Sequence, residues 1–210
     1  MMKNSTSKKM LERAYAVKSS DDVQRLYRDW AETYDDDLEV DLGYHAPKLL
    51  SLMLSRVVDD LKSRILDVGC GTGLVGSSLS TRGYINVDGL DFSLDMLEVA
   101  REKRIYKNLI QADLNKKLKF DDGTYDAMIC CGTLTRGHVD PEVLIELLRI
   151  LKQGAPLACT INSWIWTEKK FDRWIEAAVT DGLLALEEKS SEDYFSTSDE
   201  KGFFCLLRKC

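Results

Sequence analysis

The chain has 210 residues, 44% of them hydrophobic, which is enough apolar material for one sizeable domain and leaves little room for two. Its formal net charge is -6 and its basic residues form only short clusters such as 116–119, so we expect no nucleic-acid partner, a small RNA apart. No run reaches the roughly 18 apolar residues of a membrane-spanning helix, so we expect no membrane partner and a cytoplasmic location.

The six cysteines form neither a CxxC pair nor a regular framework. Most of them fall in or beside expected strands, or in a glycine turn, where a small apolar side chain packs well. We therefore expect reduced thiols and no disulfides, and we expect no metal because no residues stand at the spacing of a zinc site. The sequence leaves the oligomeric state open.

Residues 1–19 are polar and weakly patterned, which predicts a frayed tail leading into helical residues. A helix is expected from Ser20 to about Thr33, with two aspartates in its first turn, where they suit the helix dipole. One face of this helix carries apolar and aromatic residues at helical spacing, namely Val23, Leu26, Tyr27, Trp30, Ala31 and Tyr34. This stripe predicts a helix docked on the core.

The acidic run 35–41 predicts a solvated turn. A second helix is expected to open at 43–47, with Pro47 in its first turn, and to reach about Val58.

Residues 64–68 form a short apolar run rich in β-branched residues, which predicts a strand buried on both faces. Gly69, Gly71 and Gly73 follow, and they let the backbone turn sharply and approach a ligand because no Cβ stands in the way. A helix is expected next, over 73–82. A strand, a glycine turn and a helix N-terminus in succession predict a site for a nucleotide-like ligand at the carboxyl edge of a parallel sheet.

Two acidic residues bear on which nucleotide would bind. Gly71, Gly73 and Gly76 match the GxGxxG of dinucleotide-binding proteins, and Asp91 stands at about the distance of a ribose-binding acid, a pattern that by itself favours NAD. Asp67, however, precedes the first glycine by two residues, where a carboxylate would repel a pyrophosphate but suit a ligand with an ammonium and a sulfonium. An NAD-linked oxidoreductase stays open as a lesser alternative.

The rest of the chain alternates between strand and helix patterns with short connections. Strands are expected over 64–68, 85–90, 108–111, 125–131, 156–162, 183–189 and 202–208. Helices are expected over 73–82, over 93–104 with Ser93 as the cap, from Pro141 to Lys152, and over 167–181. The pattern predicts an α/β, Rossmann-like sheet of seven strands with an antiparallel last strand and helices on both faces.

The D-x-G-x-G-x-G arrangement from Asp67 to Gly73, with Asp91, Asp113 and the strand Tyr125 to Cys131 in order after it, resembles the class I methyltransferases that use S-adenosylmethionine. The resemblance implies the seven-stranded class I methyltransferase sheet and S-adenosyl-L-methionine as the cofactor. It places Asp67 near the cofactor's amino group, Asp91 at the ribose and Asp113 at the adenine. The implied cofactor-binding residues are Tyr27, Trp30, Tyr34, Tyr44, Asp67, Gly69, Cys70, Gly71, Thr72, Gly73, Asp91, Phe92, Met96, Ala112, Asp113, Leu114 and Cys131.

Residues 27–35 are similar to the segment with which many small-molecule methyltransferases cover the cofactor. This similarity implies a lid within residues 20–60, and hence two parts: an N-terminal tail and helical lid over 1–61, and a class I methyltransferase domain over 62–210. Over the whole chain the pattern looks most like the methyltransferase-like group of the Williams–Beuren syndrome region, a resemblance that implies a cofactor site but names no acceptor.

Methyl transfer from a sulfonium is an in-line displacement that needs alignment and the exclusion of water, and it needs a general base only if the acceptor holds its proton. His138 is the candidate catalytic base, with an exposed loop histidine as the alternative, while His45 is expected to be structural. The aromatic residues in 164–166 and 194–195 predict an acceptor pocket or packing beneath the sheet.

The sequence therefore predicts an enzyme that methylates a small-molecule acceptor. The alternative is a non-catalytic protein that binds S-adenosylmethionine and acts as a partner or regulator.

Overall fold

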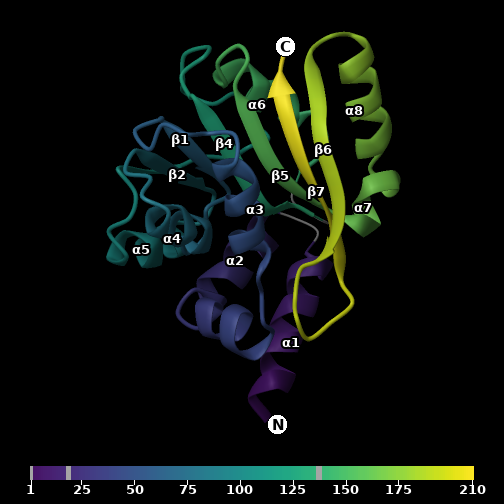
Figure 1. Cartoon of the computed structure of the whole chain (residues 1–210). Helices are drawn as coiled ribbons and strands as arrows, with labels where there is room; N and C mark the ends of the chain where they lie inside the picture. Colours follow the sequence, from purple (N-terminus) through teal and green to yellow (C-terminus); the bar gives the residue numbers. More distant parts are fainter. Residues whose placement is uncertain (1, 18–19, 136–138) are drawn as a thin grey trace.

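A single sheet of seven strands organises the chain, and the computed structural model describes residues 2–17, 20–135 and 139–210 around it (Figure 1). The strand order is β3-β2-β1-β4-β5-β7-β6, and β7 runs antiparallel to both of its neighbours. The strands are β1 Ile65–Val68, β2 Val87–Asp91, β3 Asn108–Gln111, β4 Ala127–Leu134, β5 Pro156–Asn162, β6 Leu184–Asp193 and β7 Lys201–Lys209. The predicted seven-stranded architecture with its antiparallel last strand is confirmed.

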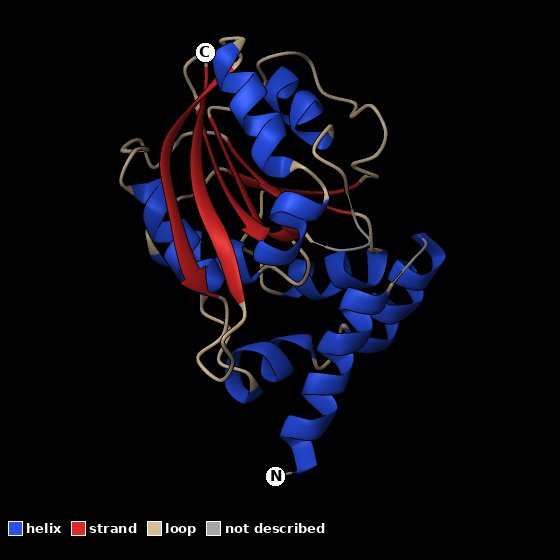
Figure 2. Cartoon of the chain, turned by 90° about the vertical axis from the view of Figure 1, so that its right-hand side faces the viewer, coloured by secondary structure: helices blue, strands red, loops and turns tan. Residues whose placement is uncertain are grey.

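Helices cover both faces of this sheet (Figure 2). They are α1 Met2–Ala16, α2 Ser20–Trp30, α3 Ala46–Ser55, α4 Leu74–Thr81, α5 Leu94–Glu102, α6 Val143–Ile150, α7 Ser163–Glu168 and α8 Phe171–Thr180, with a π-helix, η1, at Asp36–Asp41. Alternating strand residues serve two cores: Ile65 joins the core under α3 and α4, and its neighbour Leu66 joins the core under α6, α7 and α8. The central strands β1 and β5 are therefore buried on both sides of the sheet.

The predicted cap of α5 is also present. The Ser93 hydroxyl accepts a hydrogen bond from the backbone N–H of Met96 at 3.3 Å, which satisfies one of the free amides of the first turn.

The N-terminal region is more ordered than the sequence suggests. Residues 2–16 are helical, so the predicted frayed tail is wrong. Ser7 of this helix is buried, and its hydroxyl donates to Asp37 at 2.9 Å and to Asp41 at 2.8 Å. Likewise the acidic run forms the helix η1 instead of a solvated turn, because the Trp30 indole N–H donates to Asp37 at 2.7 Å and Leu38 is buried. These long-range partners hold a segment that its composition alone would leave in solvent.

The predicted helix 167–181 is also partly wrong, because the chain forms two helices there. The helix α7 starts directly after β5, where the Asn162 side chain accepts a hydrogen bond from the N–H of Trp164 at 2.9 Å. Lys170 then adopts a left-handed backbone conformation, with φ 61°, and separates α7 from α8. Since neither Gly nor Pro marks this break, local sequence signals do not reveal it.

One charged group stabilises the edge of the sheet opposite the strands' carboxyl ends. The Asp88 side chain is fully buried in β2, where it accepts hydrogen bonds from Asn108 at 2.6 Å and Tyr125 at 3.1 Å. Arg64 donates to the same carboxylate from Nη2 at 2.9 Å and Nε at 3.1 Å. This network joins β2 to β3 and to the segments that lead into β1 and β4.

The helices α1 and α2 lie at the other end of the sheet, and α1 runs beside the connection between β6 and β7 (Figure 1). Tyr44 pairs with Phe195 of that connection, and the N–H of Ser196 donates to the carbonyl of Gly43 at 3.0 Å. The N-terminal segment is thereby fixed over the carboxyl ends of the parallel strands, where α/β sheets bind their ligands.

Candidate functional site

The glycine turn after β1 has the backbone conformation that its sequence predicts. Gly69, Gly71 and Gly73 have φ values of 68°, 53° and 97°, a left-handed region that favours glycine. A Cβ at Gly69 would stand 2.0 Å from the Thr133 hydroxyl, whereas a Cβ at Gly71 would meet nothing within 4 Å. Gly69 is therefore needed for packing, and Gly71 leaves space on the side of the turn where a ligand can approach.

Asp91, at the end of β2, closes this turn from the neighbouring strand. One carboxylate oxygen accepts a hydrogen bond from the N–H of Gly71 and the other from the N–H of Ser93, both at 2.8 Å. Burial raises the pKa of Asp91, although these backbone donors oppose the shift. The carboxylate is thus held in one orientation by groups that a cofactor would not displace.

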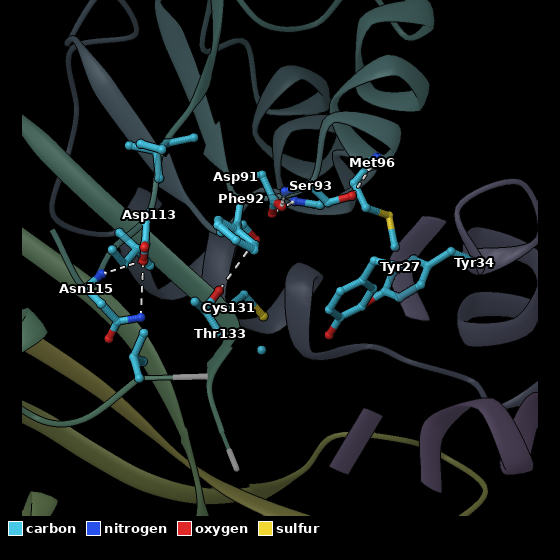
Figure 3. Close-up of a pocket in the computed structure, with 17 residues that line it drawn as sticks. Tyr27, Tyr34, Asp91, Phe92, Ser93, Met96, Asp113, Asn115, Cys131 and Thr133 are labelled. Carbon is cyan, nitrogen blue, oxygen red and sulfur yellow. Dashed lines mark hydrogen bonds between the residues drawn. The ribbon is translucent and has the colours of Figure 1, made fainter. Parts of the chain in front are cut away.

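A cavity of about 860 Å³, including its open mouth, lies at these strand ends. Eleven of the predicted cofactor-binding residues line it, namely Tyr27, Tyr34, Gly69, Gly71, Asp91, Phe92, Met96, Ala112, Asp113, Leu114 and Cys131. Figure 3 shows Tyr27 and Tyr34 on one side of the cavity, with Asp113 and Asn115 across from them. The structure brings these residues together from distant parts of the chain, and their roles toward a cofactor stay predictions.

The other predicted residues lie elsewhere. Trp30 and Tyr44 line a second, adjacent cavity. Asp67, Cys70, Thr72 and Gly73 do not line the first cavity but belong to the strand end and glycine turn beside it. The candidate base His138 lies outside the described residues.

Six residues of the first cavity were not among the predicted ones: Leu90, Ser93, Asn115, Gly132, Thr133 and Val139. Ser93 and Asn115 each stand two residues after a predicted acid, and Gly132 and Thr133 follow Cys131. These four residues could have been predicted from their position in the sequence. A residue that closely follows a predicted contact at the carboxyl end of a parallel strand lies at the same edge of the sheet.

Asp113 is part of a local turn at that edge. Its Oδ1 accepts hydrogen bonds from the backbone N–H of Asn115 at 3.0 Å and from the Asn115 side chain at 3.2 Å. Lys116 lies 3.3 Å from the other oxygen. Partial burial opposes ionisation, but the donors of Asn115 and Lys116 outweigh it and lower the pKa of Asp113. The residue therefore presents a carboxylate at neutral pH.

Asp67 fits a positively charged ligand on two grounds. It is fully buried, with Oδ2 accepting a hydrogen bond from Tyr106 at 2.6 Å, and its Oδ1 has no hydrogen-bond partner among the residues that the structure describes. Burial raises the pKa of Asp67 to about 7, against the lowering effect of the Tyr106 bond, and the nearby charge of Asp91 adds to the rise. A cation in the adjacent cavity would favour the ionised form.

We expect Asp67→Asn to raise the melting temperature of the ligand-free protein at pH 8 and to weaken the binding of a cationic cofactor. The pKa of Asp67 is raised on folding, so its contribution to stability is most favourable below the unfolded pKa and is lost as the pH rises toward 7. A neutral amide removes that loss, and about 1 kcal/mol would appear as ~2–4 °C. Thermal melts at pH 5 and pH 8, which compare the two proteins, check the expectation.

The same substitution should flatten the pH dependence of cofactor affinity, which we expect to increase from pH 6 to pH 8 in the natural protein as Asp67 ionises. Asp95→Ala, a change on the neighbouring α5 outside both cavities, is the control. An equally steep pH dependence in Asp67→Asn would show that another group, such as Asp91, is responsible.

A single carboxylate ties the N-terminal segment to the glycine turn. Asp35, which follows Tyr34, accepts hydrogen bonds from the Thr72 hydroxyl and from the Nζ of Lys103, the residue directly after α5, both at 2.5 Å. The Asp35 and Lys103 side chains are only 30% and 23% exposed, so this ion pair is partly shielded from solvent. These contacts hold the segment in place over the first cavity.

The second cavity, of about 480 Å³ including its open part, lies under the N-terminal helices. Its aromatic walls are Tyr15, Tyr27, Trp30, Tyr34, Tyr44, Tyr194 and Phe195. Tyr27, Tyr34 and Gly132 line the first cavity as well, and the Tyr44 hydroxyl lies 3.5 Å from the Sγ of Cys131, which is in the wall of the first. The two cavities are therefore neighbours that share a wall.

The other aromatic and histidine candidates divide between packing and the cavities. Trp166 packs against Phe203 with ring centroids 4.5 Å apart, and neither it nor Trp164 lines either cavity. Tyr194 and Phe195 do line the second cavity, so the pocket interpretation holds for that pair alone. The His45 ring lies 3.1 Å from the Gly43 carbonyl at the start of α3, in agreement with the expected structural role.

Within residues 2–17, 20–135 and 139–210, no three His, Cys, Asp or Glu side chains are grouped so that they could hold a metal ion. In the same part of the chain, every helix is too short or too polar to cross a membrane.

Comparisons with known proteins agree with this geometry. A family model described as a methyltransferase domain matches residues 65–154. The chain is similar to methyltransferase-like protein 27 of Homo sapiens, with 32% identity over 170 residues that cover 76% of this chain and 69% of that protein. It is also similar to a demethylmenaquinone methyltransferase of Renibacterium salmoninarum, with 31% identity over 147 residues, 70% of this chain and 61% of that protein.

Among solved structures, the [4+2]-cyclase SpnF has a TM-score of 0.71 and covers 92% of this chain and 97% of its own, at 17% identity. That likeness concerns the fold alone. Because this neighbour is named a cyclase, the fold by itself does not specify the reaction.

Proposed function

The chain belongs to the class I S-adenosylmethionine-dependent methyltransferases, and from this premise we propose that it transfers the methyl group of S-adenosyl-L-methionine by in-line displacement to a small-molecule acceptor. The observation that carries the proposal is the pair of adjoining cavities, in which Tyr27, Tyr34 and Gly132 contribute to both. A donor in the first cavity and an acceptor in the second would meet at this common wall.

The residues of the first cavity suit the parts of the cofactor. Asp91, held by Gly71 and Ser93, would accept hydrogen bonds from the ribose hydroxyls, and Asp113 at the far end would meet the adenine. The glycine turn would carry the methionine end, with the buried charge of Asp67 behind it. The free space at Gly71 supports this orientation, as does Asp67 Oδ1, which has no hydrogen-bond partner among the described residues.

The cofactor supplies a methyl group on a positively charged sulfur, so the acceptor's lone pair forms the new bond as the carbon–sulfur electron pair returns to sulfur. The protein then has to align the acceptor and exclude water. Tyr27 and Tyr34 would do both from the N-terminal segment, which Asp35 fastens to Thr72. We also propose that residues 1–61 form a lid on the methyltransferase domain, which comprises residues 62–210.

The chain's own groups near the common wall favour positioning over covalent catalysis. Burial raises the pKa of the Cys131 thiol to about 12, so this thiol stays protonated and is a poor nucleophile at neutral pH. The Tyr44 hydroxyl beside it also has a raised pKa, because it is buried and lies near Cys131. If the acceptor atom carries a proton, a base beyond these two groups has to remove it.

The test is turnover with labelled S-adenosyl-L-methionine and an ultrafiltrate of cell extract that is free of macromolecules. We expect S-adenosylhomocysteine to form only when the ultrafiltrate is present, together with a labelled small product. Turnover that requires the retained fraction and is lost on ribonuclease treatment would point to an RNA acceptor. Donor binding without turnover in any fraction would favour the non-catalytic alternative.

A further inference from the structure

The second cavity has a lining that restricts the chemistry of its occupant. Among the described residues, the side chains that line it are aromatic, aliphatic or hydroxyl-bearing, and none of them is Asp, Glu, Lys, Arg or His. A buried carboxylate, phosphate or ammonium on a ligand would lose its hydration there without gaining an opposite charge. The described part of the lining therefore matches an uncharged acceptor better than a charged one.

The shape of the lining favours a flat ring. The rings of Tyr44 and Phe195 lie 5.1 Å apart at a tilt of 33°, and those of Trp30 and Tyr34 lie 4.7 Å apart nearly edge to face. All four rings belong to residues that line the cavity, and an aromatic ring packs well against other aromatic rings.

Two polar atoms in this wall lack partners. The hydroxyls of Tyr194 and Thr135 are buried and have no hydrogen-bond partner within the described part of the chain, although both residues line the cavity. Tyr194 is 4% exposed and Thr135 is 6% exposed, so water does not readily satisfy them. A ligand oxygen placed against either hydroxyl would complete a hydrogen bond that the protein alone leaves unmade.

We propose, on the basis of the proposed function, that the methyl acceptor is an uncharged, planar aromatic molecule that carries a hydroxyl or carbonyl oxygen. Its ring occupies the second cavity, and its oxygen meets Tyr194 or Thr135. The helix α1 supplies part of the chamber through Leu11, Ala14 and Tyr15, so this helix helps to select the acceptor.

The experiment uses the full chain loaded with S-adenosylhomocysteine and three probes of equal ring size: 2-naphthol, 2-naphthoate and 2-naphthylmethylammonium. Calorimetry should show that 2-naphthol binds roughly tenfold or more tightly than either charged probe. A charged probe that binds as tightly as 2-naphthol, or a 2-naphthol that does not bind, would overturn the inference while leaving the proposed function intact. Failure of S-adenosylhomocysteine itself to bind would overturn both.

A variant and its matched control locate the binding site of 2-naphthol. Ala14→Phe fills the cavity and should abolish 2-naphthol binding without changing the affinity for S-adenosylhomocysteine. Ala16→Phe places the same side chain at an exposed position of the same helix and should change neither. An equal loss of 2-naphthol binding in both variants would show that the probe binds outside the second cavity.

The double variant Tyr194→Phe with Thr135→Val keeps the cavity's shape and removes only the hydroxyls of these two residues. It should lower the affinity for 2-naphthol by about tenfold and leave the affinity for naphthalene, which has no oxygen, unchanged. This comparison does not depend on whether the larger Ala14→Phe side chain is accommodated. Unchanged 2-naphthol affinity would overturn the assigned role of the hydroxyls and of the ligand oxygen.

Discussion

Replacing Asp91 by alanine is expected to weaken S-adenosyl-L-methionine binding by about 2–3 kcal/mol, which corresponds to roughly 30- to 150-fold in affinity. The carboxylate lines the first cavity, and two backbone donors, the N–H groups of Gly71 and Ser93, hold it there. Alanine removes the charged acceptor from the cavity and also frees the glycine turn from β2. Titration calorimetry with S-adenosyl-L-methionine measures the loss directly.

The matched control is Asp95→Ala, the same change four residues later at a position that lines neither cavity. It should bind the cofactor as the natural protein does. Since Asp91→Ala also deprives two N–H groups of their acceptor, thermal melts of both variants are needed alongside the titrations. Normal affinity in a folded Asp91→Ala protein would remove Asp91 from the cofactor site and weaken the proposed orientation of the cofactor.

Asp88→Ala is expected to lower the free energy of unfolding by about 2–4 kcal/mol. The Asp88 side chain is fully buried and accepts hydrogen bonds from Arg64, Asn108 and Tyr125. Its loss leaves the buried Tyr125 hydroxyl without that acceptor. Arg64 can regain water because its side chain is 42% exposed, so the loss should fall short of that for a fully buried ion pair. Urea denaturation at neutral pH measures it.

Asp199→Ala, at an exposed position between β6 and β7, is the control variant, and it should leave the urea concentration at the midpoint of unfolding unchanged. Below the midpoint, folded Asp88→Ala should still bind S-adenosyl-L-methionine, because Asp88 lies toward the other end of β2 from Asp91. A variant as stable as the natural protein would mean that the network is replaced by water at little cost.

The sequence predicts most of the sheet because its signals are local. Strands such as Pro156–Asn162 consist mainly of apolar residues, and the cap at Ser93 and the glycine turn each depend on a few adjacent residues. The first cavity follows from the same rules, since Asp91 and Asp113 end or follow parallel strands, and such ends share one edge of the sheet.

The parts that the sequence does not predict depend on partners far along the chain. The helix α1 and the acidic η1 are ordered by the hydrogen bonds of Ser7 and Trp30 to Asp37. No local sequence pattern predicts these hydrogen bonds. The second cavity is of the same kind, because it forms where α1 meets the β6–β7 connection. Tyr15 and Tyr194 come together there although they stand far apart in the sequence.

The contacts of Asp35 have a consequence for the timing of ligand exchange. Asp35 follows Tyr34 directly, and Tyr34 belongs to the walls of both chambers. If residues 1–61 act as the proposed lid, an opening that parts Asp35 from Thr72 and Lys103 would uncover both chambers in one event. Spent donor and methylated product would depart through a shared exit, and their dwell times would rise and fall together.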